Sequence, residues 1–287
     1  MTTEFGRRLT GGSFRREQLL KKVALYAVLV MAALVFLIPY MWTVSSSLKP
    51  EQDIFSRDMS LLPSSFEWQN YVDAWTDWPL GTWLKNSIIV ALIETFSVVF
   101  TAVLAGYAFA RLRFWGRDTL FLMYLGAMMI PIQVTIIPSF VIITKLNLVD
   151  TYMGIASIRL VQFFGVFLIR QFFMNLPTEL EDAARIDGCN RLRILVQIFI
   201  PLSGPALMAL SIFAFTAAWN DFLWPLVAVT RPEVYTVQIG LATMKGEVIR
   251  WGPMLAATAL SALPVLAMYL LLQRYFTQGI AMTGLKG

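Results

Sequence analysis

The amino-acid sequence predicts an all-α integral membrane protein with six transmembrane helices. Of its 287 residues, 57% are hydrophobic and only 14% are charged, whereas soluble domains carry about 25% charged residues. The charged residues are also clustered, which leaves several long stretches almost free of them. A stretch of about 20 apolar residues is long enough to cross the hydrocarbon core of a bilayer as a helix.

Six stretches meet this condition. The predicted spans cover about residues 23–46, 86–110, 119–144, 151–170, 194–224 and 252–274. The first is too long to be the apolar core of a cleaved signal peptide, which has about 7–15 residues, so we expect it to be retained. Prolines inside the spans predict kinks or interrupted helices, and these are Pro39, Pro131, Pro138, Pro205 and Pro264.

The distribution of basic residues predicts the orientation. If the N-terminus is cytoplasmic, the inside segments hold 15 Lys and Arg and the outside segments hold 7. Cytoplasmic loops carry the excess of basic residues, so we expect both termini in the cytoplasm. The predicted organisation is a basic tail over residues 1–22, a membrane domain over 23–276 and a second cytoplasmic tail over 277–287.

The composition excludes several classes of function. The chain has no histidine, which removes histidine acid–base catalysis and histidine metal sites. Its single cysteine, Cys189, permits no disulfide within the chain. No phosphate-binding loop of the form G-x-x-x-x-G-K-[ST] occurs. We therefore predict no catalytic residue, no metal and no bound cofactor, and a protein that is not itself an enzyme.

A short charged helix is predicted in the inside loop between the fourth and fifth spans, at about residues 178–188. Thr178 and Glu181 have the spacing of a capping box, in which each side chain binds the other residue's backbone amide. Gly188 can end the helix in a left-handed conformation. The helix is thus specified at both ends.

Leu180, Ala183, Ala184 and Asp187 are expected on one face of this helix, where two alanines would let another element approach closely. The alternative is an amphipathic helix that lies on the membrane surface. Its many acidic residues fit an anionic inner leaflet poorly, which counts against that alternative.

The same segment resembles the EAA signature of ABC-importer permeases. Asp182-Ala183-Ala184 is followed after three residues by Gly188, and after nine more by Ile198-Phe199-Ile200-Pro201. Asp182 for Glu and Ile200 for Leu are the two departures. Other runs resemble the carbohydrate branch of that family: 47–50, 105–111, 130–133, 218–223, 273–276 and 284–287. The resemblance is to the smaller, six-span permease of the maltose-type arrangement, with the type I ABC importer fold.

This resemblance implies a function and a set of partners. The charged helix would be the coupling helix that docks on an ATPase subunit, through Glu181, Asp182, Ala183, Ala184, Arg185, Asp187 and Gly188. The expected partners are a second permease, two ATPase copies that hold ATP and Mg, and an extracytoplasmic solute-binding protein, with no nucleic acid. The location would be a bacterial or archaeal cytoplasmic membrane. The expected solute is a sugar; the alternatives are a non-sugar solute such as glycerol phosphate, or a secondary transporter.

Two charges lie inside predicted spans at equal depth. Glu94 and Arg159 each follow the outer end of their span by nine residues, or about 13 Å at 1.5 Å per residue. Opposite charges at one depth predict an intramembrane ion pair, since a lone buried charge is costly. This pair would either lock two spans together or line the transport path.

A second group of candidates lies late in the fifth span. Trp219, Asn220, Asp221 and Trp224 combine aromatic rings with hydrogen-bonding groups, as a sugar site requires. The alternative is an interfacial aromatic belt. In the family that the chain resembles, the outside loop 231–250 meets the binding protein; otherwise it is an ordinary loop.

Overall fold

The computed structural model describes residues 4–56, 60, 62–246 and 249–283, and within them the chain is all α-helical. The predicted fold class is confirmed. The run 284–287 and the first three residues of the basic tail lie outside the described residues. The chain forms two compact units: residues up to Asp73 with Arg250–Ala259, and Ala74–Ile249 with the chain from Leu260 onward.

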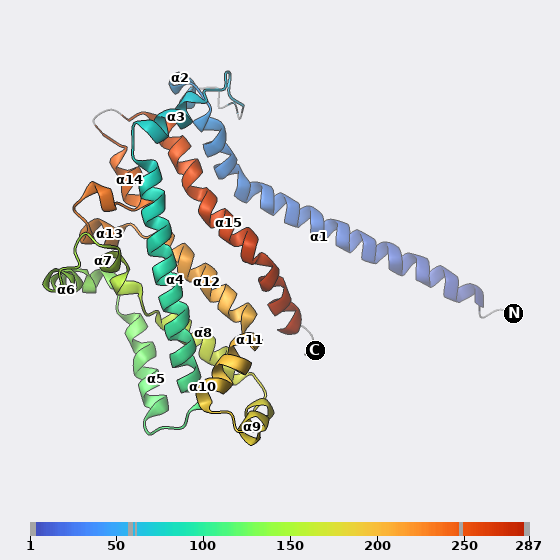
Figure 1. Ribbon diagram of the computed structural model, residues 1–287. Helices are drawn as coiled ribbons and strands as arrows, with labels where there is room; N and C mark the ends of the chain where they lie inside the picture. Colours follow the sequence, from blue (N-terminus) through green and yellow to red (C-terminus); the bar gives the residue numbers. More distant parts are fainter. Residues whose placement is uncertain (1–3, 57–59, 61, 247–248, 284–287) are drawn as a thin grey trace. The chain divides into compact units, whose positions relative to one another are not determined.

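Fifteen α-helices lie in the described residues (Figure 1). They are α1 (Glu4–Ser47), α2 (Glu51–Ile54), α3 (Gln69–Thr76), α4 (Leu80–Arg111), α5 (Arg117–Gly126), α6 (Ile132–Lys145), α7 (Tyr152–Ala156), α8 (Phe163–Met174), α9 (Glu179–Ile186), α10 (Arg191–Ile194), α11 (Ile200–Leu202), α12 (Gly204–Trp219), α13 (Leu223–Ala228), α14 (Val237–Thr243) and α15 (Trp251–Thr283). Short 3-10 helices η1 (Ala127–Met129), η2 (Ser157–Arg159) and η4 (Pro232–Val234) and a π-helical turn, η3 (Leu195–Phe199), connect some of them.

Three of the expected spans are unbroken helices and three are bent. In the described residues, Gln18–Ser47, Leu80–Arg111 and Trp251–Gln273 are long and apolar enough to cross a membrane. The bent pairs are Arg117–Met129 with Ile132–Lys145 at 98°, Tyr152–Arg159 with Phe163–Met174 at 54°, and Arg191–Leu202 with Gly204–Trp219 at 80°. If each bent pair is one span, the total is six, as predicted.

The breaks have identifiable causes. Pro131 and Pro205 lie at two of them, whereas Pro39, Pro138 and Pro264 sit inside continuous helices. The third break, around Leu160, contains no proline. There the freed carbonyl of Leu160 accepts hydrogen bonds from Ser97 Oγ at 2.8 Å and Thr101 Oγ1 at 3.4 Å, both on α4. A bend within the hydrocarbon core is tolerated when a neighbouring helix satisfies such a carbonyl.

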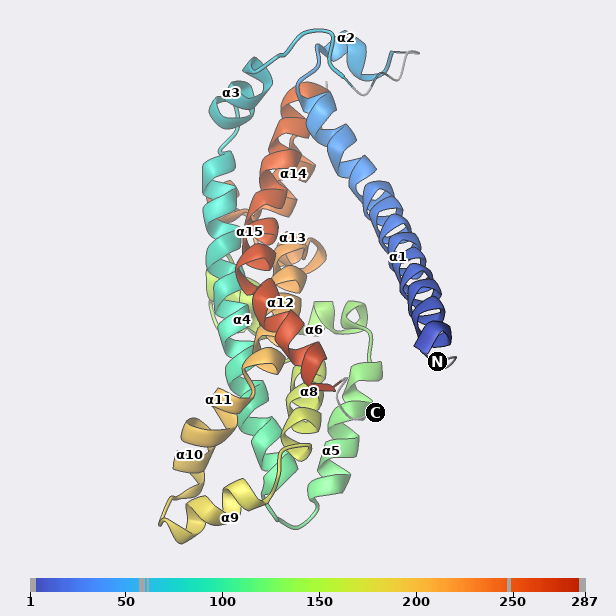
Figure 2. The ribbon, with the colours of Figure 1, turned by 90° about the vertical axis from the view of Figure 1, so that its right-hand side faces the viewer.

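The core of the larger unit is formed where α4 packs against α8 and α12, which run alongside it in both ribbon views (Figures 1 and 2). Gly106 of α4 makes the approach to α8 possible, because a Cβ there would lie 2.9 Å from Ile169 Cγ2. Val98, Ala102, Val166, Phe173 and Leu210 are among the fully buried side chains at this contact.

In the smaller unit, the segment after α1 is tied to the start of α15. The Glu51 carboxylate accepts from the backbone amides of Trp251 at 2.7 Å and Gly252 at 3.1 Å. A carboxylate at a helix N-terminus satisfies free amides and complements the helix dipole. Arg250 and Asp73 form an ion pair in the same unit. This part of the loop between the first two spans is therefore folded.

The segment between α12 and α15 is anchored to α4. Asn86 Nδ2 donates to the carbonyls of Glu233 and Tyr235, both at 2.9 Å, and Tyr152 Oη donates to Asn86 Oδ1 at 2.8 Å. Gly240 lies in α14, where a Cβ would meet Trp83 Cδ2 at 2.1 Å, so glycine permits a close contact here.

Replacing Gly240 with alanine should therefore destabilise the protein. Overpacking costs about 1–3 kcal/mol, and the Trp83 ring is buried and has little room to move. Thermal unfolding in detergent should show a lower Tm for Gly240→Ala. Gly126→Ala is the matched control, because a Cβ at Gly126 meets nothing within 4 Å. Equal Tm values for the two variants would refute the packing argument.

Asp150 anchors the same segment from the loop before α7. Its carboxylate accepts from Thr230 N at 2.6 Å, Thr230 Oγ1 at 2.8 Å and Arg231 N at 2.9 Å. Desolvation raises the pKa of Asp150, but the hydrogen bonds from Arg231 and Thr230 outweigh it and hold the pKa below its usual value. The carboxylate form is thus favoured in the folded state.

This anchor should weaken in acid. A carboxyl group whose pKa is lowered by folding stabilises the fold above its unfolded pKa, about 3.9, and that stabilisation is lost as the pH falls through the folded value. Amide hydrogen exchange at Thr230 and Arg231 should therefore accelerate, beyond its intrinsic pH dependence, below about pH 4. In Asp150→Asn the two amides should exchange faster at neutral pH too; slow exchange there would contradict the assignment.

Candidate functional site

The predicted charged helix is α9, and its C-terminal end is closed as expected. Gly188 has φ +78°, which confirms the left-handed cap. Its amide donates to the Arg185 carbonyl at 3.0 Å, and the Cys189 amide donates to the Ala184 carbonyl at 2.9 Å. These two bonds form a Schellman motif, which satisfies carbonyls that otherwise lack partners at a helix end.

The N-terminal end differs from the prediction. Thr178 has helical backbone angles and its side chain makes no cap hydrogen bond, so the prediction of a capping box is wrong. The Thr178 carbonyl instead accepts from the amides of Glu181 at 3.0 Å and Asp182 at 3.1 Å. The Glu181 side chain is used elsewhere, in a 2.5 Å ion pair with Arg185 one turn later. The Glu181 carboxylate is therefore bound to Arg185, whereas a capping box would require it to bind the Thr178 amide.

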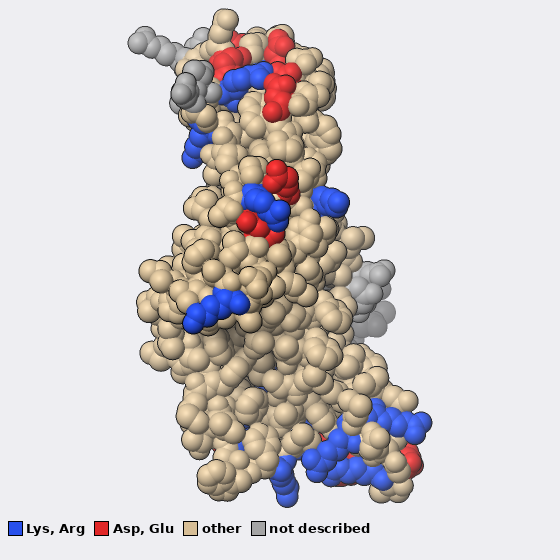
Figure 3. Space-filling view, turned by 60° about the vertical axis from the view of Figure 1, so that its left-hand side comes forward, with Lys and Arg blue, Asp and Glu red and all other residues tan. Residues whose placement is uncertain are grey.

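The four residues expected on one face of α9 differ in exposure. Glu181 and Ala184 are buried, while Leu180, Ala183 and Asp187 are exposed. Ile186 is 87% exposed, which leaves a large apolar side chain on the outer surface. Figure 3 shows charged side chains gathered at the lower end, where α9 and α10 lie in Figure 1.

Directly inside α9, the chain forms an aromatic and cationic cluster. Tyr107 of α4, Phe173 of α8 and Phe199 of η3 meet edge-to-face with ring centroids 5.1–6.2 Å apart. Ala184 packs into the same buried cluster. The Arg111 guanidinium lies 5.1 Å from the Phe199 ring centroid and donates to the carbonyls of Phe173 at 2.6 Å and Leu176 at 2.5 Å. Three helical elements, α4, α8 and η3, therefore meet at one joint beneath α9, which sequence reasoning missed.

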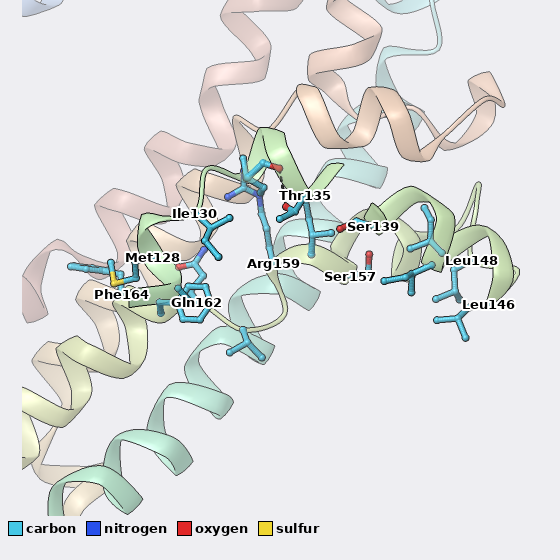
Figure 4. Close-up of a pocket in the computed structure, with 17 residues that line it drawn as sticks. Met128, Ile130, Thr135, Ser139, Leu146, Leu148, Ser157, Arg159, Gln162 and Phe164 are labelled. Atoms are coloured by element: carbon cyan, nitrogen blue, oxygen red, sulfur yellow. Dashed lines mark hydrogen bonds between the residues drawn. The ribbon is translucent and has the colours of Figure 1, made fainter. Parts of the chain in front are cut away.

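A cavity of about 640 Å³ opens where the third and fourth spans are broken. η1, α6, η2 and the start of α8 line it, mostly with apolar side chains (Figure 4). The polar side chains in the lining are Thr135, Ser139, Ser157, Arg159 and Gln162. Arg159 thus lies in the wall of the cavity, at the bend of the fourth span.

Arg159 has a different partner from the one predicted. Its Nε donates to Asp221 Oδ2 at 2.8 Å, and the Asp221 side chain is only 8% exposed. Glu94 is buried, and its Oε2 accepts no hydrogen bond from the described residues. It lies close enough to interact electrostatically with both Arg159 and Asp221. The structure therefore brings the three intramembrane charges together, but pairs Arg159 with Asp221.

The two tryptophans of the fifth-span group are structural in this conformation. Trp219 is buried and its Nε1 donates to the Ser261 carbonyl at 3.1 Å. Trp224 is buried as well, and its Nε1 donates to the carbonyls of Gly154 and Ile155. Neither ring presents a face to the cavity. Asn220 is exposed, with its Nδ2 bound to the Thr216 carbonyl one turn earlier.

The bent spans and the short helix α9 lie in a part of the chain that matches a known protein family. Residues 97–282 match the family model described as binding-protein-dependent transport system inner membrane component. The chain belongs to this family. This confirms the predicted resemblance, and the chain is a multi-pass inner-membrane transport permease.

Curated relatives cover nearly the whole chain. It is 33% identical to the arabinooligosaccharides transport system permease protein AraQ of Halalkalibacterium halodurans, over 89% of this chain and 93% of that protein. It is 35% identical to the sn-glycerol-3-phosphate transport system permease protein UgpE of Pectobacterium atrosepticum, over 89% and 94%. A solved bacterial ABC transporter involved in import of the acidic polysaccharide alginate has the same fold, with a TM-score of 0.77 at 24% identity, over 91% of this chain and 98% of that chain.

Proposed function

We propose that this permease carries a sugar or sugar-like solute inward by alternating access, driven by a partner ATPase that docks on α9. The observation that carries the proposal is the construction of α9: a short helix with a Schellman end, an exposed outer face and an inner face set into the core. Relatives named for arabinooligosaccharides and for sn-glycerol-3-phosphate support the solute class.

The joint beneath α9 provides a route for movement. Ala184 contacts the cluster that joins α4, α8 and η3, and α12 follows η3 after a bend of 80°. Displacement of α9 by a closing ATPase dimer would move these elements as packed bodies, since close-packed interiors transmit strain. The residues assigned to ATPase coupling remain Glu181, Asp182, Ala183, Ala184, Arg185, Asp187 and Gly188. Glu181 and Ala184 would act from the inner face.

The proposed assembly follows from this role. It contains a second permease, two ATPase subunits that hold ATP and Mg, and a solute-binding protein that meets the outer segment 231–250. Both termini and α9 would face the cytoplasm, as the 15 Lys and Arg of the inside segments favour. The tails 1–22 and 277–287 would lie on the same side. No cofactor is assigned to this chain.

Reconstitution of the complete transporter in proteoliposomes tests the proposal. Solute uptake should require ATP, the ATPase subunits and the binding protein, and solute-loaded binding protein should raise the rate of ATP hydrolysis. A secondary transporter would instead move solute in response to an ion gradient without ATP. Uptake that persists without ATP and follows such a gradient would overturn the proposal.

A further inference from the structure

We propose that the cavity beside Arg159 accepts uncharged, hydroxyl-rich solutes and excludes anions, and that Asp221 sets this selectivity by neutralising Arg159. This inference rests on the proposed function, because it treats the cavity as part of the solute path. It assigns Asp221 a role through Arg159, as a residue that determines specificity.

The charges around the cavity do not favour an anion. Arg159 is the one charged residue among the described side chains that line it. The Arg159 Nε donates to the Asp221 carboxylate at 2.8 Å. Glu94 adds a second carboxyl group within electrostatic range of both residues. The net charge of the three groups is zero if Glu94 is protonated and −1 if it is ionised. In neither case is it positive.

An anionic solute would have to separate the pair. A phosphate or carboxylate that bound Arg159 through its fork of donors would compete with Asp221 for the guanidinium. Asp221 is only 8% exposed, so it would be left as a buried charge with no partner, which is strongly unfavourable. The pair is therefore a barrier to anions even though an arginine is present.

A neutral polyol meets no such penalty. The guanidinium has five N–H donors, and the Asp221 bond uses only the one on Nε. The Nη groups remain as donors for hydroxyl oxygens. Gln162 and Ser139 line the same cavity, and their side chains add further polar groups. The apolar side chains around them suit the C–H faces of a sugar ring. This combination differs from a site for phosphorylated or acidic sugars.

The potential inside the cavity can be measured without knowing the solute. Thr135 lines the cavity and is exposed, so Thr135→Cys in a Cys189→Ser background places a single thiol there. The complete transporter in membrane vesicles is treated with two methanethiosulfonates, one with an anionic sulfonate group and one with a cationic trimethylammonium group. The ratio of their reaction rates reports the local charge. Leu146→Cys is the control, because Figure 4 shows Leu146 at one end of the cavity, farther from Arg159 than Thr135 is.

With Asp221 intact, the thiol at position 135 should react with the cationic reagent at least as fast as with the anionic one. Asp221→Asn should shift the ratio toward the anionic reagent by about tenfold, which corresponds to about 1.4 kcal/mol, with a smaller shift at position 146. Asp221→Glu keeps the charge and should keep the ratio. If Asp221→Asn does not fold, Arg159→Gln should shift the ratio the opposite way.

A preference for the anionic reagent in the parent protein would overturn the inference, as would an unchanged ratio in both neutralising variants or a thiol that reacts with neither reagent. These outcomes are separate from failure of the proposed function, which is judged by ATP-dependent uptake in the parent transporter. A transporter that couples normally but has an anion-selective cavity would disprove only the inference made here.

Discussion

Replacing Gly188 with proline should leave the permease inserted in the membrane and abolish solute-stimulated ATP hydrolysis by the assembled transporter. Gly188 has φ +78°, whereas proline fixes φ near −65°. Proline also removes the amide that donates to the Arg185 carbonyl at 3.0 Å. The Schellman turn cannot form, so α9 loses its fixed direction relative to α10. ATP hydrolysis with and without solute-loaded binding protein measures the effect.

The chain offers a closely matched control. Gly116 also has positive φ, +77°, and at both glycines a Cβ would meet nothing within 4 Å. Gly116→Pro imposes the same backbone strain outside α9 and should keep the stimulation. Gly188→Asn should keep most of it too, because asparagine tolerates the left-handed conformation. Normal stimulation in Gly188→Pro, or equal loss in Gly116→Pro, would contradict the role of α9.

Replacing Arg111 with alanine should have the next largest effect, chiefly on stability. The guanidinium donates to the carbonyl of Phe173 in the last turn of α8 and to that of Leu176 just after the helix. A hydrogen bond to a charged group contributes about 1.5–3 kcal/mol. Its loss would leave carbonyls of Phe173 and Leu176 without this donor and remove the contact with the Phe199 ring. We expect a clearly lower Tm in detergent and weaker solute stimulation of ATP hydrolysis.

Arg113, two residues further along, supplies the control because it is exposed. Arg113→Ala should leave Tm and stimulation close to those of the parent protein. The Tm and the stimulation of Arg111→Lys should lie between those of the parent protein and those of Arg111→Ala, since lysine keeps the charge but lacks the planar fork that reaches two carbonyls. If Arg111→Ala and Arg113→Ala behaved alike, the joint beneath α9 would not hold α8 in the way described.

Much of the fold could be predicted because bilayer thickness imposes a simple rule. Apolar length identified six stretches, and each contains a long helix or a bent pair. The bends themselves were predicted only where proline causes them, at Pro131 and Pro205. The break at Leu160 depends on hydroxyl groups from α4, and such support from a neighbouring helix has no local signal in the sequence.

The candidate sites show the same limit. Gly188 was predictable because its cap depends on the local backbone alone. The pairing of Glu94 with Arg159 was not, because equal depth was counted along straight helices. The fourth span bends by 54° next to Arg159, and Asp221 reaches its guanidinium from another span. Likewise Trp224 has the kind of aromatic side chain that sugar sites use, but it is buried, and its burial depends on packing.

The most direct test of the coupling role is to ask what touches the outer face of α9. Ile186 is 87% exposed and Ala184 on the inner face is 6% exposed. Each is replaced with cysteine in a Cys189→Ser background, labelled with a benzophenone and irradiated within the complete transporter. We expect the label at position 186 to cross-link to the ATPase subunit and the label at position 184 not to do so. Cross-links from position 186 to lipid alone, or to no protein, would contradict it.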